Sequence, residues 1–160
     1  MNGFTATAAP PEQATDAVVG NDSFWPDITA TKLRDACRLD GTVSTQRLAH
    51  ALINALVEVN RQLEDLQAQA IEDGFETLAD LPAKQVAGVS AKVHHYTRAV
   101  YATVQAALTE TSRAVDTVVS TAHEGSRMQL MADVVAEYRR TAHNALNDLR
   151  GKTRVTVDLL

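Results

Sequence analysis

The chain has 160 residues, a formal net charge of −5 at pH 7 and a single cysteine, Cys37. This length is typical of one domain with its own core, and a lone cysteine excludes an internal disulfide. Residues 1–30 carry four acids and no Lys or Arg, whereas residues 31–160 carry 16 acids and 15 bases. We therefore expect no face basic enough to grip duplex DNA. No apolar run predicts a membrane span or a secretory signal, and a reducing compartment during synthesis is expected.

The N-terminal residues 1–23 are predicted to form a flexible arm, because they are rich in Ala, Thr and acids and poor in large apolar side chains. The pattern changes at residues 24–28, where Phe-Trp-Pro-Asp-Ile brings the only tryptophan beside a proline. Packing on the chain's own body or an identical neighbour is favoured over contact with a different protein. Four residues of this segment are candidates for subunit-interface or docking contacts: Phe24, Trp25, Pro26 and Ile28.

Three long helices are predicted to follow a short helix over about residues 31–39. Apolar residues recur every three or four positions over residues 44–74, 90–118 and 127–149, which is the period of a helix. Helices of about 23 to 29 residues would be about 35 to 43 Å long. The sequence therefore predicts an all-α, elongated bundle of three long helices plus the short one, with residues 24–151 as the helical connector domain.

The last segment, residues 152–160, changes period. Apolar and polar side chains alternate there, which is typical of a strand. We find no convincing second strand pattern, so a strand here would need the sheet edge of another protein. A frayed tail is the alternative. The alternating apolar residues are Val155, Val157 and Leu159.

No pattern of catalytic or metal-binding residues is recognisable. None of the five histidines lies four residues from another, Cys37 has no evident base, and no glycine-rich phosphate loop is present. The sequence therefore predicts a protein that is not an enzyme and has no catalytic residues, no metal and no cofactor. Arg139 and Arg140 are predicted to lie on a solvated helix face, with intersubunit ion pairs as the alternative.

Four stretches in order along the chain resemble the GPL family of phage head-completion proteins, which belong to temperate phages with contractile tails. They are FWPDI at residues 24–28, GFETLADLPA at 74–83, KVHHYTRAV at 92–100, and the end from Gly151 with Lys152 and Arg154. The likeness covers residues 24–160. It is weak between residues 110 and 131 and does not extend to the N-terminal arm.

This resemblance implies a structural protein of the virion neck that is made in the host cytoplasm and acts after DNA packaging. Identical subunits would form a ring of about twelve beneath the portal protein. The ring would stabilise the DNA-filled head and dock a neck or tail-terminator protein, while packaged DNA passes through without specific binding. No membrane is implied. The predicted portal-binding residues are Lys152, Arg154, Val155, Val157, Leu159 and Leu160.

The alternative belongs to another class of protein. The apolar stripe over residues 128–149 could pair two copies of a stand-alone helical bundle with an interaction or regulatory role. Mass measurement with and without portal would separate this hypothesis from a ring subunit.

Overall fold

The computed structural model describes residues 18–39, 41–116 and 124–152, and most of these are helical. The helices are α1 (Ala30–Ala36), α2 (Thr45–Gln62), α3 (Glu64–Glu72), α4 (Ala91–Asp116) and α5 (Glu124–Leu149), with a short 3-10 turn at Leu78–Asp80. The predominantly helical character predicted from the sequence is confirmed. The simple three-helix bundle is not confirmed, for two reasons.

The first difference is a set of short strands that the sequence did not reveal. Strand β1 (Val18–Val19) pairs antiparallel with β2 (Ile28–Thr29), and β3 (Gln85–Val86) pairs antiparallel with β4 (Val89–Ser90). Each strand has only two residues, which is too short to display an alternating pattern. The expectation that no second strand exists was therefore wrong.

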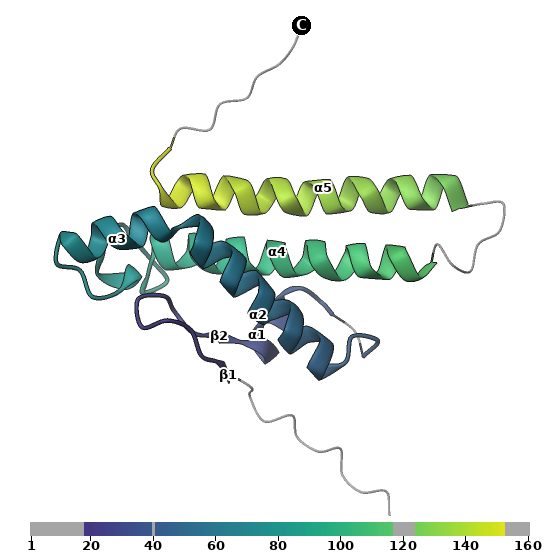
Figure 1. The fold of residues 1–160 in the computed structure, drawn as a ribbon, viewed down its shortest axis with the longest axis horizontal. Helices are drawn as coiled ribbons and strands as arrows, with labels where there is room; N and C mark the ends of the chain where they lie inside the picture. Colours follow the sequence, from purple (N-terminus) through teal and green to yellow (C-terminus); the bar gives the residue numbers. More distant parts are fainter. Residues whose placement is uncertain (1–17, 40, 117–123, 153–160) are drawn as a thin grey trace, which may run out of the picture.

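The second difference is a break in the helix predicted over residues 44–74. It begins as predicted, since the Ser44 hydroxyl accepts a hydrogen bond from the Arg47 amide at 3.3 Å. It is interrupted at Leu63, and α3 then continues in a new direction (Figure 1). Leu63 is fully buried, as is Ala70 in α3. Because the apolar spacing continues across the break, periodicity alone could not locate it.

Helices α4 and α5 form an antiparallel hairpin, and α2 crosses it obliquely (Figure 1). Each hairpin helix has 26 residues, which corresponds to about 39 Å. The core lies where the part of the hairpin nearest residues 91 and 149 meets α1, α2 and α3. The other end of the hairpin extends beyond α2.

The apolar stripe of α5 faces the interior of the same chain. Val135, Ala142, Ala145 and Leu149 are all buried. Burial of a helix stripe against its own chain removes it from solvent. These side chains are thus largely unavailable for the dimer that the alternative hypothesis placed on residues 128–149.

Candidate contact surfaces

The segment over residues 24–28 lies inside the body of the chain. Phe24, Trp25 and Ile28 are only 2–3 % exposed, whereas Pro26 is partly exposed. The Trp25 ring stacks on the Tyr96 ring at 5.0 Å between centroids, and Phe24 meets Trp25 edge-on at 4.8 Å. The segment therefore packs on its own chain. Its role in contacts with another subunit stays a prediction, and its burial leaves little side-chain surface for that purpose.

A closed set of hydrogen bonds holds this segment to α2 and α4. The Tyr96 hydroxyl donates to Asn60 Oδ1 at 2.6 Å and accepts from Asn21 Nδ2 at 2.8 Å, while Asn60 Nδ2 donates to Asn21 Oδ1 at 2.8 Å. The Tyr96 side chain is fully buried, and burial raises the pKa of its hydroxyl above its ordinary value. Buried polar groups that are fully paired specify one arrangement of their elements. Sequence reasoning missed Asn21 and Asn60, because a polar residue at one position carries no periodic signal.

These contacts bear on the predicted N-terminal arm. Residues 18–23 contact the helical body through β1, through Asn21 and through Asp22, whose carboxylate accepts from Gln67 Nε2 at 3.1 Å. Hydrogen bonds from Gln67 and from the Phe24 amide lower the pKa of Asp22. The predicted arm thus includes six residues that belong to the body. Residues 1–17 lie outside the described residues.

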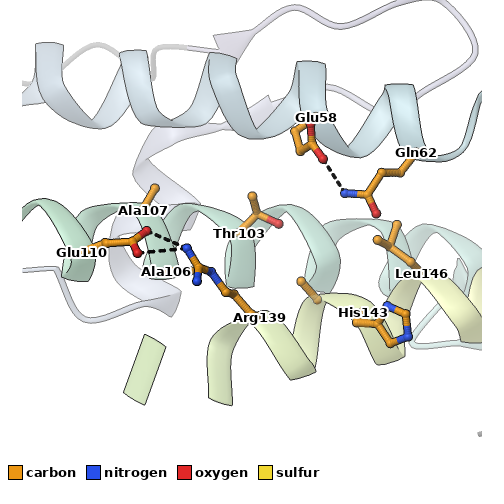
Figure 2. Close-up of a pocket in the computed structure, with 10 residues that line it drawn as sticks. Glu58, Gln62, Thr103, Ala106, Ala107, Glu110, Arg139, His143 and Leu146 are labelled. Carbon is orange, nitrogen blue, oxygen red and sulfur yellow. Dashed lines mark hydrogen bonds and ion pairs between the residues drawn. The ribbon is translucent and has the colours of Figure 1, made fainter. Parts of the chain in front are cut away.

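A groove of about 470 Å³ lies between α2 and the α4–α5 hairpin, and we call it the α2 groove. Its floor contains Ala106, Ala142 and Leu146. Figure 2 shows Glu58 and Gln62 of α2 on one side, where Gln62 Nε2 donates to Glu58 Oε1 at 2.7 Å. Hydrogen bonds from Arg61 and Gln62 lower the pKa of Glu58. Glu58, Glu110 and Arg139 have partners in the described chain, and His143 Nε2 lies 2.9 Å from Asn147 Nδ2. The groove therefore offers mainly small apolar surface.

The two arginines predicted on the solvated face of α5 form ion pairs within the chain. The Arg139 guanidinium donates to both carboxylate oxygens of Glu110 at 2.8 and 2.9 Å across the hairpin (Figure 2). Arg140 pairs with Glu137 one turn earlier on α5. All four side chains are substantially exposed. The intersubunit ion pairs proposed for Arg139 and Arg140 remain a prediction.

A second groove, of about 330 Å³, lies where the end of α1 meets α4, and we call it the α1–α4 groove. Ala36, Cys37 and Tyr101 form apolar parts of its wall, and His94 and Arg98 add nitrogen-rich side chains. Burial raises the pKa of the Cys37 thiol from 9.0 to about 11. A thiol with a raised pKa is a weak nucleophile at neutral pH, so the pKa shift gives no support to thiol chemistry in this groove.

The start of the C-terminal tail is anchored at the end of α5. The Lys152 amide donates to the Asn147 carbonyl at 2.9 Å, and Gly151 has a φ of +67°, in the left-handed region that glycine readily adopts. The end of the last predicted helix at residue 149 is confirmed. The side chain of Lys152 is exposed. The other predicted portal-binding residues lie outside the described residues: Arg154, Val155, Val157, Leu159 and Leu160.

Arg150 connects this end of α5 to the break between α2 and α3. Its guanidinium donates to the Gln62 carbonyl and lies 3.5 Å from Asp65. The Gln62 carbonyl is at the C-terminal end of α2, where backbone acceptors lack helical partners and a cation is favoured. The sequence by itself does not reveal this contact of Arg150.

The described residues offer little for chemistry. Within them no cluster of three or more His, Cys, Asp or Glu side chains could hold a metal ion. None of the described helices is long and apolar enough to cross a lipid bilayer. What the fold presents is grooves, exposed helix faces and anchored ends, which together define a helical protein suited to contacts with other proteins.

Comparison with known proteins is consistent with that class. The family model described as phage head completion protein (GPL) matches residues 19–160. A relative named head completion/stabilization protein, from Escherichia phage P2, is 32 % identical over 157 residues, covering 98 % of this chain and 91 % of the relative. No solved structure matches. The chain belongs to the phage head completion protein (GPL) family, and the resemblance inferred from its sequence motifs is confirmed.

Proposed function

We propose that the chain is a head-completion subunit of the phage virion that assembles as a ring of identical copies under the portal. The ring stabilises the DNA-filled head and provides the docking surface for a neck or tail-terminator protein. The observation that carries the proposal is the family match over residues 19–160, together with the relative named for head completion and stabilization. This role is structural and needs no catalytic residue, metal or cofactor.

The geometry supports a role in protein contacts. Large apolar side chains are exposed on three helices, among them Ile53 and Val57 on α2, Ile71 on α3, and Leu130 and Val134 on α5. Each pair within a helix is spaced by four residues and shares one face. Exposed apolar faces of this kind are typical of surfaces that a neighbour covers. Repetition around a ring makes contacts that are weak in one subunit firm when all engage.

The alternative of a stand-alone dimer is less well supported. It needs the apolar stripe of residues 128–149 to face a second copy, whereas Val135 and Ala145 of that stripe are buried against the same chain. Freeing the stripe would require α5 to separate from α4, which would expose the buried apolar side chains between these two helices to water.

The C-terminal tail is the proposed anchor on the portal. Lys152 leaves α5 exposed, and the alternating Val155, Val157 and Leu159 would bury on one side while the backbone joins a portal strand. Arg154 and Lys152 would pair with portal acids. In this arrangement the near-neutral body lets DNA pass through the ring without specific binding. Assembly would take place in the host cytoplasm and the mature location is the neck of the virion.

The test is deletion of residues 152–160, followed by quantification of the protein on purified DNA-filled heads. We expect occupancy of the portal vertex to fall at least about tenfold, the factor that corresponds to about 1.4 kcal/mol of binding free energy. A triple change of Val155, Val157 and Leu159 to Ser should act like the deletion. The matched control changes Thr156 and Asp158 to Ser on the opposite side of the strand. Full occupancy by the truncated chain would show that the tail is not the anchor.

A further inference from the structure

The two ends of α2 carry opposite charge. Residues 62–83, which include α3, contain six acids and no Lys or Arg. Residues 30–50, which include α1 and the start of α2, contain four Lys or Arg against two Asp. The six acids are all exposed: Glu64, Asp65, Glu72, Asp73, Glu76 and Asp80.

These two surfaces lie apart on the molecule. Helix α3 follows the C-terminal end of α2, whereas α1 connects to its N-terminal end, where Arg34 donates to the Val43 carbonyl at 2.9 Å. The 18 residues of α2 span about 27 Å. Figure 1 shows α3 and α1 towards opposite ends of α2. Two such surfaces cannot meet within one chain, but they can meet between copies.

The acidic surface has an apolar centre. Ile71 is 56 % exposed, next to Glu72 and Asp73 on the last turn of α3. An exposed isoleucine flanked by carboxylates is a protruding apolar side chain with an acidic rim. It matches a socket that has an apolar wall and a basic rim.

The α1–α4 groove has those properties. Ala36, Cys37 and Tyr101 provide apolar wall, Arg98 and His94 lie on the lining, and no acid lines the groove. Arg38 is exposed just after Cys37. Neither Arg98 nor Glu72 forms an ion pair within the described residues. Each surface therefore presents at least one charged side chain that has no ion-pair partner among the described residues.

We infer that the α1–α4 groove receives Ile71 and its acidic rim from a second copy of this chain, and that this contact is the head-to-tail interface of the ring. The inference rests on the proposed ring. Because the two surfaces differ, each copy inserts Ile71 into the groove of one neighbour and receives Ile71 of the other neighbour in its own groove. The contact then repeats around a closed assembly. Glu72 and Asp73 of one copy face Arg98 and Arg38 of the next.

Site-directed cross-linking tests the contact. In a Cys37→Ser background, Ile71→Cys and Ala36→Cys place one thiol on each predicted surface, since both positions are exposed. The full-length variant is assembled on purified heads and treated with a short bismaleimide. We expect a ladder of covalent multimers. The matched control replaces Ile71→Cys by Val57→Cys, because Val57 is 64 % exposed on the outer face of α2, and it should give no ladder.

Charge exchange provides an independent readout. Glu72→Lys should weaken multimer formation at least about tenfold, and adding Arg98→Glu to the same chain should restore it, because like charges at an interface repel and the reversed pair attracts again. A stabilising effect confined to one chain would not give this rescue.

The outcomes separate the interface from the ring. The unaltered chain can prove multimeric on heads while the variant with Ala36→Cys and Ile71→Cys gives no more cross-linked multimers than the control. That result would overturn the interface but not the ring. If the unaltered chain is present as single copies on heads, the ring is overturned and this interface with it. Cross-linked multimers of the variant with Ala36→Cys and Ile71→Cys, together with rescue by the charge exchange, would support both the interface and the ring.

Discussion

Tyr96 shows how a single residue joins distant parts of the chain. Its ring stacks on Trp25 from the N-terminal segment, and its hydroxyl bonds to Asn60 of α2 and Asn21 beside β1. The ring is fully buried on α4. The sequence by itself does not reveal the polar partners of this tyrosine. The hydroxyl therefore fixes the positions of α2, α4 and residues 18–29 relative to one another.

We predict that Tyr96→Phe destabilises the fold by about 1–3 kcal/mol, because Asn60 Oδ1 loses its donor in a part-buried site. Urea unfolding measures the change. Tyr101→Phe is the control on the same helix, since the half-buried Tyr101 hydroxyl makes no hydrogen bond within the described residues, and it should cost little. Equal costs for the two variants would contradict a special role for the Tyr96 hydroxyl.

The raised pKa of the Cys37 thiol predicts that the free energy of unfolding depends on pH. Burial raises the pKa of its thiol from 9.0 to about 11 in the folded chain. Between these values the folded chain keeps a proton that the unfolded chain releases, so the contribution is full below about pH 9 and is lost as the pH rises towards 11. The free energy of unfolding should fall more steeply between about pH 9 and pH 11 for the unaltered chain than for Cys37→Ala. Parallel profiles would show that the thiol does not titrate differently on folding.

At the scale of elements, the break between α2 and α3 positions the acidic helix. Leu63 is buried at the turn, and Arg150 from the end of α5 donates to the Gln62 carbonyl and lies near Asp65. An apolar stripe that continues through residues 44–74 predicts one helix, and the sequence offers no glycine or proline at the break. The break is stabilised by the tertiary contact of Arg150, at the end of α5, with Gln62 and Asp65, and not by local helix propensity.

Arg150→Ala should therefore destabilise the protein by about 1.5–3 kcal/mol, the range for hydrogen bonds to charged groups. Arg140→Ala is the matched control, because its ion pair with Glu137 is exposed, and it should cost no more than about 0.5 kcal/mol. Differential scanning calorimetry gives both values. A loss at Arg150 no larger than at Arg140 would show that the contact does not stabilise the break.

The hairpin of β3 and β4 allows a stabilising change. Its two turn residues, Ala87 and Gly88, have φ values of +51° and +75°, the left-handed conformation that two-residue hairpin turns require. Alanine is strained there, whereas asparagine is favoured. We predict that Ala87→Asn raises the free energy of unfolding by about 0.5–1 kcal/mol, measured in urea. Gly88→Ala should have the opposite effect, and a gain in stability from it would contradict the turn assignment.

At the scale of the whole molecule, the N-terminal segment is part of the body from residue 18 onward. Deleting residues 1–23 should cost about 2–4 kcal/mol, because it removes Asn21 from its hydrogen-bond ring and β1 from its partner. Deleting residues 1–17 should cost less than about 0.5 kcal/mol, as expected for a segment of this composition. Chemical denaturation of both truncations checks the boundary. Equal stability of the two truncated chains would show that residues 18–23 do not stabilise the body, and the arm would then end at residue 23.

Part of the candidate site could be predicted from the sequence. The cluster at residues 24–28 stood out because a tryptophan beside a proline interrupts a polar segment, and the pair Arg139–Arg140 stood out as adjacent charge. Neither pattern reveals a partner. The structure pairs Arg139 with Glu110, 29 positions earlier, because the hairpin brings the two helices side by side. The α1–α4 groove was missed, since its lining comes from three separate elements.

The sequence by itself determined the helical class, the long α4 and α5, the helix start at residue 44, the helix end at residue 149, and the family, because periodicity, caps and motifs are local properties. The tertiary structure alone decided the break at Leu63, the two-residue strands, and the burial of Trp25 against Tyr96. These depend on contacts between residues far apart in the chain, and burial against a distant helix outweighs the weak local preference at each position.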